Sequence, residues 1–482
     1  MPTKPVMIAC AVCVALWGPA SHSADLLQVY EQATRNDPFI QEADQRRLAA
    51  LEARPQARGA LFPQIAAAGS IETIERDGSA TFLQSADVAP GDPPELDIVS
   101  FDQRMDADRW QWQAGLRQTL FRWDQWQRLG RADARVAQAE AEYRAAQQEL
   151  MVRVSQRYFD VLAAAETLRS AEATLDAFAK QLREAERRFE VGVVTVIDVE
   201  EARSARDIAT ANVISAKRAL AVTGELLAEL TGELYPELSR PKTDLPVSDP
   251  EQRGEQAWVD EALEQNLAVV AARLGVEIAK RDVRIAQSGH LPTLDLFATT
   301  GEFDEEATET VKNRNAATRT RGPADSDGSE DIIGLQVAVP IFTGGVTRSR
   351  VREQVYLHRA SRQRLQGTLR IAERSTRDAY LTVLADKARV EALQQAVNSS
   401  QTAVRATIRG VEVGERTNVD VLNARRGLFD AERDYARARY DYLTNLVRLR
   451  STVGVLLPAD LAAINAYLVE PISVAPTGAP RR

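Results

Sequence analysis

Cysteine and histidine are scarce in this sequence. Its 482 residues include two cysteines, Cys10 and Cys13, and three histidines. Both cysteines lie within residues 1–24, which have the layout of a secretory signal peptide: one lysine, a short apolar run, and small residues up to a predicted cleavage after Ala24. The mature chain would therefore have no thiol, which excludes a disulfide or a thiolate metal site. We expect neither a metal nor a cofactor.

Long apolar runs and excess positive charge are also missing. After the signal, no run of about 18 apolar residues remains that could form a membrane helix. The formal net charge of −9 becomes −10 once Lys4 is removed with the signal, and this argues against nucleic acid as a partner. We expect an exported chain that is either soluble outside the cytoplasm or inserted into a membrane as a β-barrel.

The signatures of common enzymes are absent as well. The sequence has neither the phosphate-binding pattern G-x-x-x-x-G-K-[ST] nor the zinc-protease pattern H-E-x-x-H. His290 stands at a predicted helix-to-strand turn without a nucleophile elbow, and His358 is expected on a solvated helix face. The sequence therefore predicts that the protein is not an enzyme.

What the sequence does contain is an internal duplication. Tyr158 matches Tyr380 and Gly192 matches Gly414, in both cases 222 residues later. Each copy has the order helix, strand, loop, strand, long helix, tip and returning helix, as expected for a repeated structural unit. The predicted divisions are a signal peptide (1–24), a first repeat (25–232), a linker (233–254), a second repeat (255–454) and a C-terminal segment (455–482) whose proline-rich tail (471–482) is expected to be disordered.

The long helices carry apolar residues at every seventh position. Such heptads predict helices that pack at shallow angles along a shared seam. One hairpin of this kind has too little core to stand alone, so it needs partners from the other copy or from other chains. The heptad positions are Val161, Leu168, Leu175, Leu182 and Phe189 in the first copy, and Val383, Val390, Val397, Val404 and Val411 in the second.

Four short strands are predicted, two in each copy, with acidic solvent loops at 76–109 and 303–331 between them. Strands of about ten residues suit a tilted membrane strand, although a half-buried soluble sheet is the alternative. Tryptophans crowd into residues 110–126, as in an interfacial aromatic belt. The predicted strands are Ile65–Glu75, Trp110–Phe121, Thr293–Glu302 and Gly334–Ile341, and the candidate belt residues are Trp110, Trp112 and Trp123.

The two tips, VGVVTVIDV (191–199) and VGERTNVDV (413–421), share one local pattern. Gly192 and Gly414 can adopt the left-handed conformation that ends a helix. Thr195 with Asp198, and Thr417 with Asp420, have the spacing of a capping box. Both aspartates are therefore expected to cap the returning helices.

Eight stretches of the chain carry a resemblance to a known family. Together they resemble the TolC family of outer-membrane efflux and type I secretion channel proteins, and they span essentially the whole mature chain. TGELYPEL and GHLPTLDL are close to the protein that gives this family its name. The stretches are DLLQVYEQATRNDP (25–38), YFDVLAA (158–164), RFEVGVVTVIDVEEAR (188–203), TGELYPEL (231–238), AQSGHLPTLDL (286–296), VPIFTGG (339–345), VGERTNVDVLNA (413–424) and ARYDYLTNLVRLRS (438–451).

This resemblance implies the fold class and the function. The fold would be a mixed α/β membrane protein in which duplicated long helical hairpins build an α-barrel tunnel. Four strands from each chain of a homotrimer would form a twelve-stranded β-barrel in the outer membrane, with equatorial segments near 233–260 and 455–475. The chain would be a passive exit duct that extends into the periplasm.

The resemblance also implies partners. These would be a periplasmic adaptor (membrane fusion) protein, an inner-membrane transporter of the RND, ABC or MFS type, and outer-membrane lipid. The transported substrates, the particular pump, and the balance between drug efflux and protein secretion cannot be read from the sequence. A periplasmic or surface coiled-coil protein with a structural or adhesive role is the alternative, because long heptads suit it equally.

By the same resemblance, the two tips would have different roles. Exposed valines around the first tip predict an adaptor contact, with burial against the neighbouring hairpin as the alternative. The second tip would line a periplasmic gate in which Arg416 joins Asp198 and Gln181, and Asp420 forms an acidic ring. Val411 and Asn423 depart from the family pattern, where a tyrosine and a second aspartate are expected. The candidate docking residues are Val191, Gly192, Val193, Val194 and Gly414, and the candidate gate residues are Asp198, Gln181, Arg416, Asp420 and Asn423.

Overall fold

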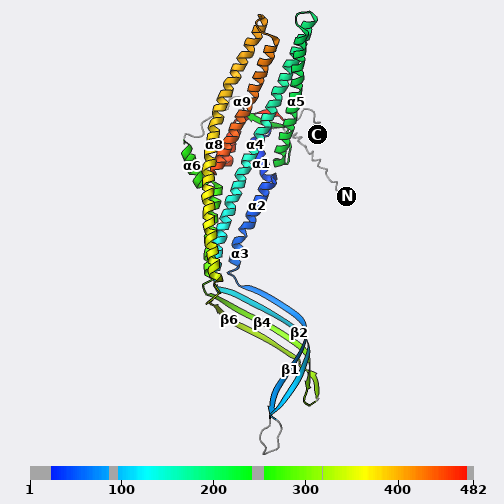
Figure 1. The fold of residues 1–482 in the computed structure, drawn as a ribbon, viewed down its shortest axis with the longest axis vertical. Helices are drawn as coiled ribbons and strands as arrows, with labels where there is room; N and C mark the ends of the chain where they lie inside the picture. The colour runs from blue at the N-terminus through cyan, green and yellow to red at the C-terminus, as the bar shows by residue number, and fades with distance from the viewer. Residues whose placement is uncertain (1–22, 86–95, 242–253, 317, 475–482) are drawn as a thin grey trace, which may run out of the picture. The chain divides into compact units, whose positions relative to one another are not determined.

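The computed structural model describes residues 23–85, 96–241, 254–316 and 318–474. Almost all of the predicted signal peptide, most of the predicted linker and the end of the predicted tail lie outside these ranges. The chain divides into two compact units (Figure 1). Unit 1 comprises Met1–Arg47, Ala139–Ala272 and Arg364–Arg482, and unit 2 comprises Leu48–Gln138 and Arg273–Gln363.

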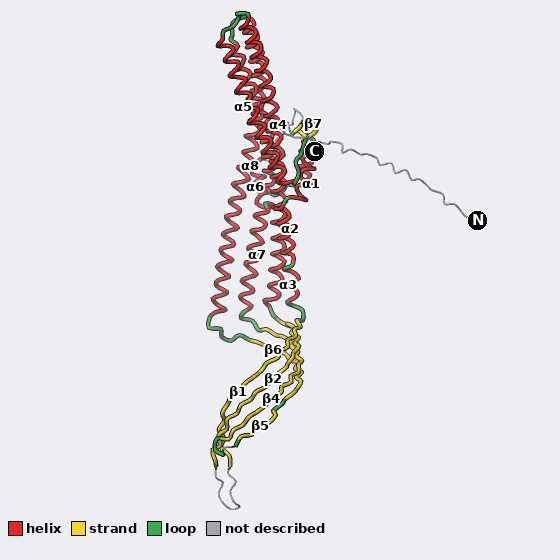
Figure 2. Tube along the Cα trace, turned by 90° about the vertical axis from the view of Figure 1, so that its right-hand side faces the viewer, coloured by secondary structure: helices red, strands yellow, loops and turns green. Residues whose placement is uncertain are grey.

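Unit 2 contains an antiparallel sheet in which neighbouring strands lie side by side in the order β1, β2, β4 and β6 (Figure 2). A short strand, β5, pairs with the far part of β4. The two repeats meet where β2 pairs with β4, so the sheet joins residues far apart in the sequence. The strands are β1 (Gln64–Ser85), β2 (Leu96–Phe121), β4 (Thr293–Asn313), β5 (Arg319–Pro323) and β6 (Ser326–Ala338).

The prediction of short strands with solvent loops at 76–109 and 303–331 is wrong. β1 has 22 residues, β2 has 26 and β4 has 21, so most of both predicted loops is strand. Polar pairs cross the β1–β2 ladder at residues of the first predicted loop: Thr73 Oγ1 donates to Asp108 at 2.8 Å, and Arg104 pairs with Glu75 at 3.7 Å. At the other end, β6 stops at Ala338, so Ile341 lies beyond the strand where the sequence predicted it inside.

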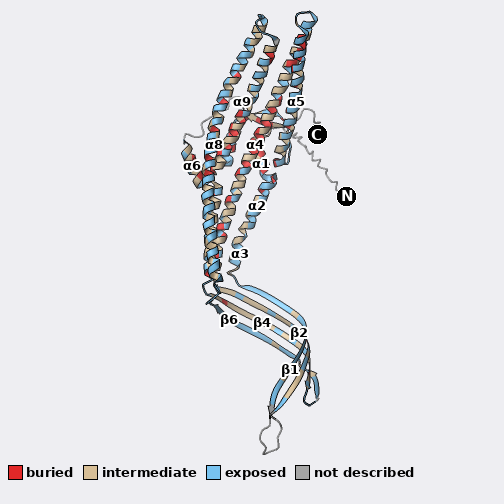
Figure 3. Ribbon diagram, in the orientation of Figure 1, coloured by how far each residue is buried: buried red, intermediate tan, exposed pale blue. Residues whose placement is uncertain are grey.

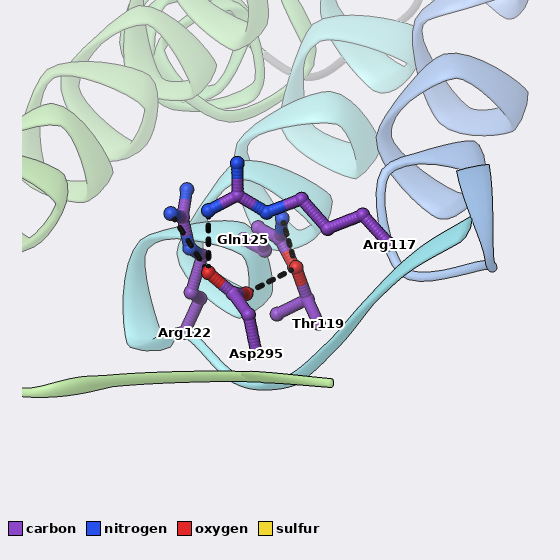
Figure 4. A network of polar contacts seen from close by, with 5 residues as sticks. All are labelled: Arg117, Thr119, Arg122, Gln125 and Asp295. Carbon is purple, nitrogen blue, oxygen red and sulfur yellow. Dashed lines mark hydrogen bonds and ion pairs between the residues drawn. The ribbon is translucent and has the colours of Figure 1, made fainter. Parts of the chain in front are cut away.

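A polar cluster joins the sheet to the helix that follows β2 (Figure 4). The buried Asp295, on β4, accepts hydrogen bonds from Arg117 Nη2 at 2.8 Å, Thr119 Oγ1 at 3.1 Å and Arg122 Nη2 at 3.3 Å. Gln125 Nε2, in the first turns of α4 (Trp123–Glu190), donates to Thr119 Oγ1 at 3.4 Å. A buried carboxylate needs several such donors. The cluster therefore fixes how the end of β2 aligns with β4.

Close packing inside unit 2 explains the one glycine in the first long helix. A Cβ built on Gly130 would lie 2.9 Å from Nη1 of Arg281. Beside it, Arg131 forms an ion pair with Asp282 at 2.7 Å. The guanidinium of Arg281, on α7 (Leu267–Ser288), therefore occupies the space above Gly130 of α4.

Unit 1 is mainly helical and contains two helical hairpins, α4 with α5 and α8 with α9 (Figure 1). The heptad prediction is confirmed along most of the seam, because Val161, Leu168, Val383 and Val390 are buried in one core. Buried residues are concentrated in these helices (Figure 3). The remaining helices are α1 (Leu26–Asn36), α2 (Pro38–Leu51), α3 (Ala53–Gly59), α5 (Val196–Thr231), α6 (Gly254–Gln265), α8 (Val346–Glu412), α9 (Asn418–Val453) and α10 (Pro458–Asn465).

A small sheet covers the middle of the hairpins in unit 1. β3 (Glu237–Pro241) pairs antiparallel with β7 (Leu468–Ser473). The buried Tyr158 donates its hydroxyl to the carbonyl oxygen of Ser239 at 2.5 Å, which ties β3 to α4. The tail was predicted to be disordered from residue 471, but β7 includes Pro471, so the start of that prediction is wrong. The last residues of the tail lie outside the described ranges. Among the helices that the model describes, none is long and apolar enough to cross a membrane.

Candidate functional site

The first tip reverses the chain between α4 and α5 in five residues, 191–195. Gly192 has φ +76°, the left-handed conformation predicted for it. Its amide donates to the carbonyl of Phe189 at 2.9 Å, and the amide of Val193 donates to Arg188 at 2.9 Å. These bonds satisfy the last carbonyls of α4, so the helix ends where the glycine allows.

The predicted capping box at the start of α5 is confirmed. Asp198 Oδ2 accepts from the Thr195 amide at 2.9 Å and from Thr195 Oγ1 at 2.7 Å, and the Asp198 amide donates back to Thr195 Oγ1 at 3.4 Å. The side-chain hydrogen bond from Thr195, followed by the one from its backbone, lowers the pKa of Asp198 below its ordinary value. Asp198 is therefore an ionised cap at neutral pH.

The second tip has the same construction between α8 and α9. Gly414 has φ +79°. Asp420 Oδ2 accepts from the Thr417 amide at 2.9 Å and from Thr417 Oγ1 at 3.0 Å. The backbone hydrogen bond and then the side-chain hydrogen bond from Thr417 lower the pKa of Asp420, and the charge of Arg416 acts in the same direction. Arg416 and Asp420 therefore lie close enough to interact electrostatically.

A groove of about 360 Å³ lies between the two hairpins next to the tips. It brings together three residues singled out in the sequence: Gln181 on α4, Asp198 on α5 and Val411 on α8. Arg416 and Asn423 are exposed outside it, and Asp420 is half-buried. The chain thus gathers part of the predicted gate around one groove and leaves the rest on the second tip.

Several charged residues of this groove were missed in the sequence. Glu184 and Arg188 follow Gln181 at helical spacings of three and seven, so they share its face of α4, and that periodicity could have identified them. Arg188 and Glu184 pair with each other at 2.6 Å. Glu412 and Arg425 line the opposite side. The groove is therefore lined by charged residues of both signs in addition to the predicted Gln181 and Asp198.

The apolar character of the first tip is displayed on its surface. Val191 is 73% exposed, Val193 68% and Ile197 65%, whereas Val194 is half-buried. Val199, one turn into α5, is buried within the hairpin. In this chain the valines at 191 and 193 are thus not covered by the neighbouring hairpin.

The candidate belt tryptophans lie in unit 2. Trp110 and Trp112 occupy β2, and Trp123 is the first residue of α4. Trp110 is 47% exposed and Trp123 43% exposed. Trp112 Nε1 donates to Glu302 Oε2 at 3.3 Å across the β2–β4 ladder. An indole that shows an apolar ring and donates through its nitrogen suits a membrane–water interface.

The comparisons with known proteins cover most of the chain. The family model "Outer membrane efflux protein" matches residues 29–233 and 258–455. The outer membrane protein TolC of Vibrio cholerae is 32% identical over 446 residues, which is 92% of this chain and 94% of that protein. The alkaline protease secretion protein AprF of Pseudomonas aeruginosa is 28% identical, over 92% of this chain and 87% of that protein.

A solved structure agrees with these matches at the level of the fold. The outer membrane protein VceC of Vibrio cholerae superposes with a TM-score of 0.65 at 19% identity, over 89% of this chain and 96% of that one. The sequence matches extend through both helical hairpins and both pairs of long strands. The chain therefore belongs to the outer membrane efflux protein family, as a TolC-type channel protein.

Proposed function

We propose that this chain is the outer-membrane exit duct of a tripartite export system that serves both efflux and type I secretion. The observation that carries the proposal is that a family model of outer-membrane efflux proteins matches both repeats, from residue 29 to 233 and from 258 to 455. The relatives include the outer membrane efflux protein BepC of Brucella suis and a protease secretion protein, so both efflux and secretion are represented among them. The channel is located in the outer membrane and works with adaptor proteins and inner-membrane transporters.

The channel is proposed to be a homotrimer. Within the described ranges, β1 pairs with β2 alone and β6 with β4 alone, so both outer strands present a free edge. Free edges of long strands require a partner, because their backbone groups are otherwise unpaired. Three chains would contribute twelve long strands to one closed sheet, since each contributes β1, β2, β4 and β6.

The first tip is proposed to dock the periplasmic adaptor. Val191 and Val193 support this because they remain exposed at the turn. Gly192 and Gly414 supply the backbone geometry of the two tips, and Val194 is half-buried. Burial of exposed valines contributes roughly 1.5–3 kcal/mol per side chain, so a few such contacts can anchor a partner. The pump behind the adaptor, of the RND, ABC or MFS type, would supply the energy.

The second tip is proposed to close the duct at its periplasmic end. Arg416 and Asp420 stand at the start of α9, and Asn423 follows one turn later. In a trimer, Asp420 would recur three times around the axis and attract cations. Asp198 and Gln181 lie at the groove between the hairpins, where Arg416 could link to them when the hairpins close. Val411 lines that groove without a hydrogen-bonding group, so it adds no polar link to this gate.

The tryptophans of unit 2 are proposed to form the membrane belt. Trp110 and Trp123 support it through their exposed rings, and Trp112 through its hydrogen bond to Glu302. Aromatic residues gather at the two edges of the apolar band of outer-membrane proteins.

Deletion of the gene and complementation test the proposal. The deletion strain should become more susceptible to toxic compounds or lose secreted proteins from the medium, and the wild-type chain should restore the lost phenotype. Outer-membrane fractions should contain a heat-modifiable trimer. A deletion strain with unchanged susceptibility and an unchanged secreted-protein profile, or a chain found as a soluble periplasmic monomer, would overturn the proposal.

A further inference from the structure

Gly410, one turn before the second tip, lies directly under the side chain of Arg416. A Cβ built on Gly410 would be 2.7 Å from Arg416 Cγ and 3.2 Å from Arg416 Cβ. Side-chain carbons do not approach each other to 2.7 Å. The position of Arg416 therefore depends on the missing side chain at residue 410.

The backbone of Gly410 holds the same turn. Its carbonyl oxygen accepts from the amide of Glu415 at 2.8 Å and from the amide of Arg416 at 3.1 Å. Because these two bonds fix the backbone of Arg416, the side chain has to leave by rotation about χ1 if a methyl group is added beneath it. The carbonyl oxygen of Gly410 and the lack of a side chain at Gly410 thus both determine where Arg416 lies.

The first tip lacks this arrangement. The residue 222 positions before Gly410 is Arg188, which carries a full side chain and pairs with Glu184 at 2.6 Å. The residue 222 positions before Arg416 is Val194. The turns themselves are alike, since both have a left-handed glycine and a Thr/Asp capping box. A glycine at 410 is therefore not a requirement of the turn, and it needs another explanation.

We propose that Gly410 is a positioning residue for the gate: its lack of a side chain seats Arg416 against the end of α8, beside Asp420. This inference rests on the gate role proposed above for the second tip. It extends that role by assigning the conformation of the gate arginine to a residue that carries no polar group. Arg416 in this seat directs its charge toward the capping carboxylate of Asp420, while a displaced arginine would be free to leave the entrance.

Alanine at 410 is a sharp test because it should otherwise improve the helix. Gly410 lies inside α8, where alanine is the better helix former. Gly367 offers a matched control in the same helix, since a Cβ there meets nothing within 4 Å. A difference between Gly410→Ala and Gly367→Ala therefore reports the contact with Arg416 and not helix propensity.

The first readout is the conductance of purified channels in planar bilayers. Arg416→Ala should raise the conductance of the closed channel, Gly410→Ala should raise it to a similar extent, and the double variant should match Arg416→Ala alone. Gly367→Ala should leave it at the wild-type value. If Arg416→Ala raises the conductance and Gly410→Ala does not, the positioning role is wrong while the gate stands.

The second readout does not depend on gating or on trimer yield. Trypsin needs an extended arginine side chain, so cleavage after Arg416 should be faster in Gly410→Ala than in Gly367→Ala. Cleavage after the remote Arg314, an exposed turn residue that is followed by Asn315, is the internal reference. Mass spectrometry of short digests measures both sites. Equal rates of cleavage after Arg416 in the two variants would show that Gly410 does not position Arg416. If cleavage after Arg416 is faster in Gly410→Ala but Arg416→Ala has the wild-type conductance, the contact between Gly410 and Arg416 stands and the gate role is wrong.

Discussion

Arg153 Nη2 donates to Asp37 Oδ2 over 2.8 Å, and the Asp37 side chain is completely buried. The second oxygen of the same carboxylate accepts from the amide of Phe39 at 2.6 Å, where α2 begins. Asn266 occupies the matching place in the second repeat, 229 residues later, and accepts from the amide of Val269 at 3.0 Å. The duplication therefore preserves a side-chain cap at the break in the first helix of each copy.

Replacement of Asp37 by Ala should strongly destabilise unit 1. The change leaves Arg153 partly buried without its partner and removes the cap of α2, and the loss of one partner of a buried pair costs about 3 kcal/mol. The urea midpoint of unfolding, followed by tryptophan fluorescence, measures the effect. Glu42→Gln is the control, because Glu42 pairs with Arg46 on the surface and should contribute less than about 1 kcal/mol. Equal midpoints for the two variants would contradict the prediction.

The two tips should fray in acid. The pKa values of Asp198 and Asp420 are lowered below the ordinary 3.8, so each cap is fully formed above that pH and is lost as the pH falls through the lower folded value. Hydrogen–deuterium exchange of peptides covering 191–199 and 413–421, corrected for intrinsic rates, should be constant from pH 7 to 5 and rise only below about pH 4.

The variants Asp198→Asn and Asp420→Asn provide the reference for this experiment. Each should exchange faster than the wild type at pH 7 and match it once the wild-type carboxylates are protonated. A difference between variant and wild type that persists unchanged below the lowered pKa would show that the carboxylate charge is not what the cap uses.

The tips were predictable because their rules are local. Gly192 and Gly414 predict a left-handed residue at the end of each helix. A Thr three residues before an Asp predicts the capping box, and neither pattern depends on the rest of the chain. The same is true of the heptad positions, such as Val161 and Val383, because burial in a helix repeats with a fixed period. Local chemistry therefore recovered the helices, the caps and the duplication.

The long strands and the groove were harder to predict because both depend on partners. Arg104 and Asp108 look like loop residues in isolation, but they lie in β2, where they contact Glu75 and Thr73 of β1. The groove needs Gln181 and Val411 from helices that are more than 200 residues apart in the sequence. Aspartate and glycine are depleted in strands, and residues 76–109 and 303–331 contain many aspartates and several glycines, so their composition predicted loops.

Val193→Asp should abolish crosslinking of the channel to its adaptor while trimers persist. The side chain is 68% exposed, so the charge costs little in the free channel but is costly once an apolar contact must cover it. Crosslinking in whole cells, followed by immunoblotting, measures adaptor contact. Ile214→Asp is the matched control, because Ile214 is 65% exposed on α5 away from the tip. Undiminished crosslinking of Val193→Asp, or an equal loss with Ile214→Asp, would remove the docking role of this tip.

Asn423→Asp should increase block of the channel by multivalent cations. Asp420 and Asn423 are three residues apart on α9 and share one face of the helix, so the variant would add a second acidic ring one turn above the first in a trimer. Neighbouring carboxylates attract cations more strongly than one ring does. The cap bonds of Asp420 go to Oδ2, so Oδ1 takes no part in the capping box.

The concentration of a multivalent cation that halves the bilayer conductance measures this block. It should fall for Asn423→Asp, rise for Asp420→Asn, and stay near the wild-type value for Asn423→Ser, a neutral control at the same position. High salt should reduce the difference, because exposed charges are screened over about 10 Å at 0.1 M ionic strength. If the half-blocking concentration is the same for Asn423→Asp and Asn423→Ser, residue 423 does not face the ion path, and α9 must present another face to the entrance.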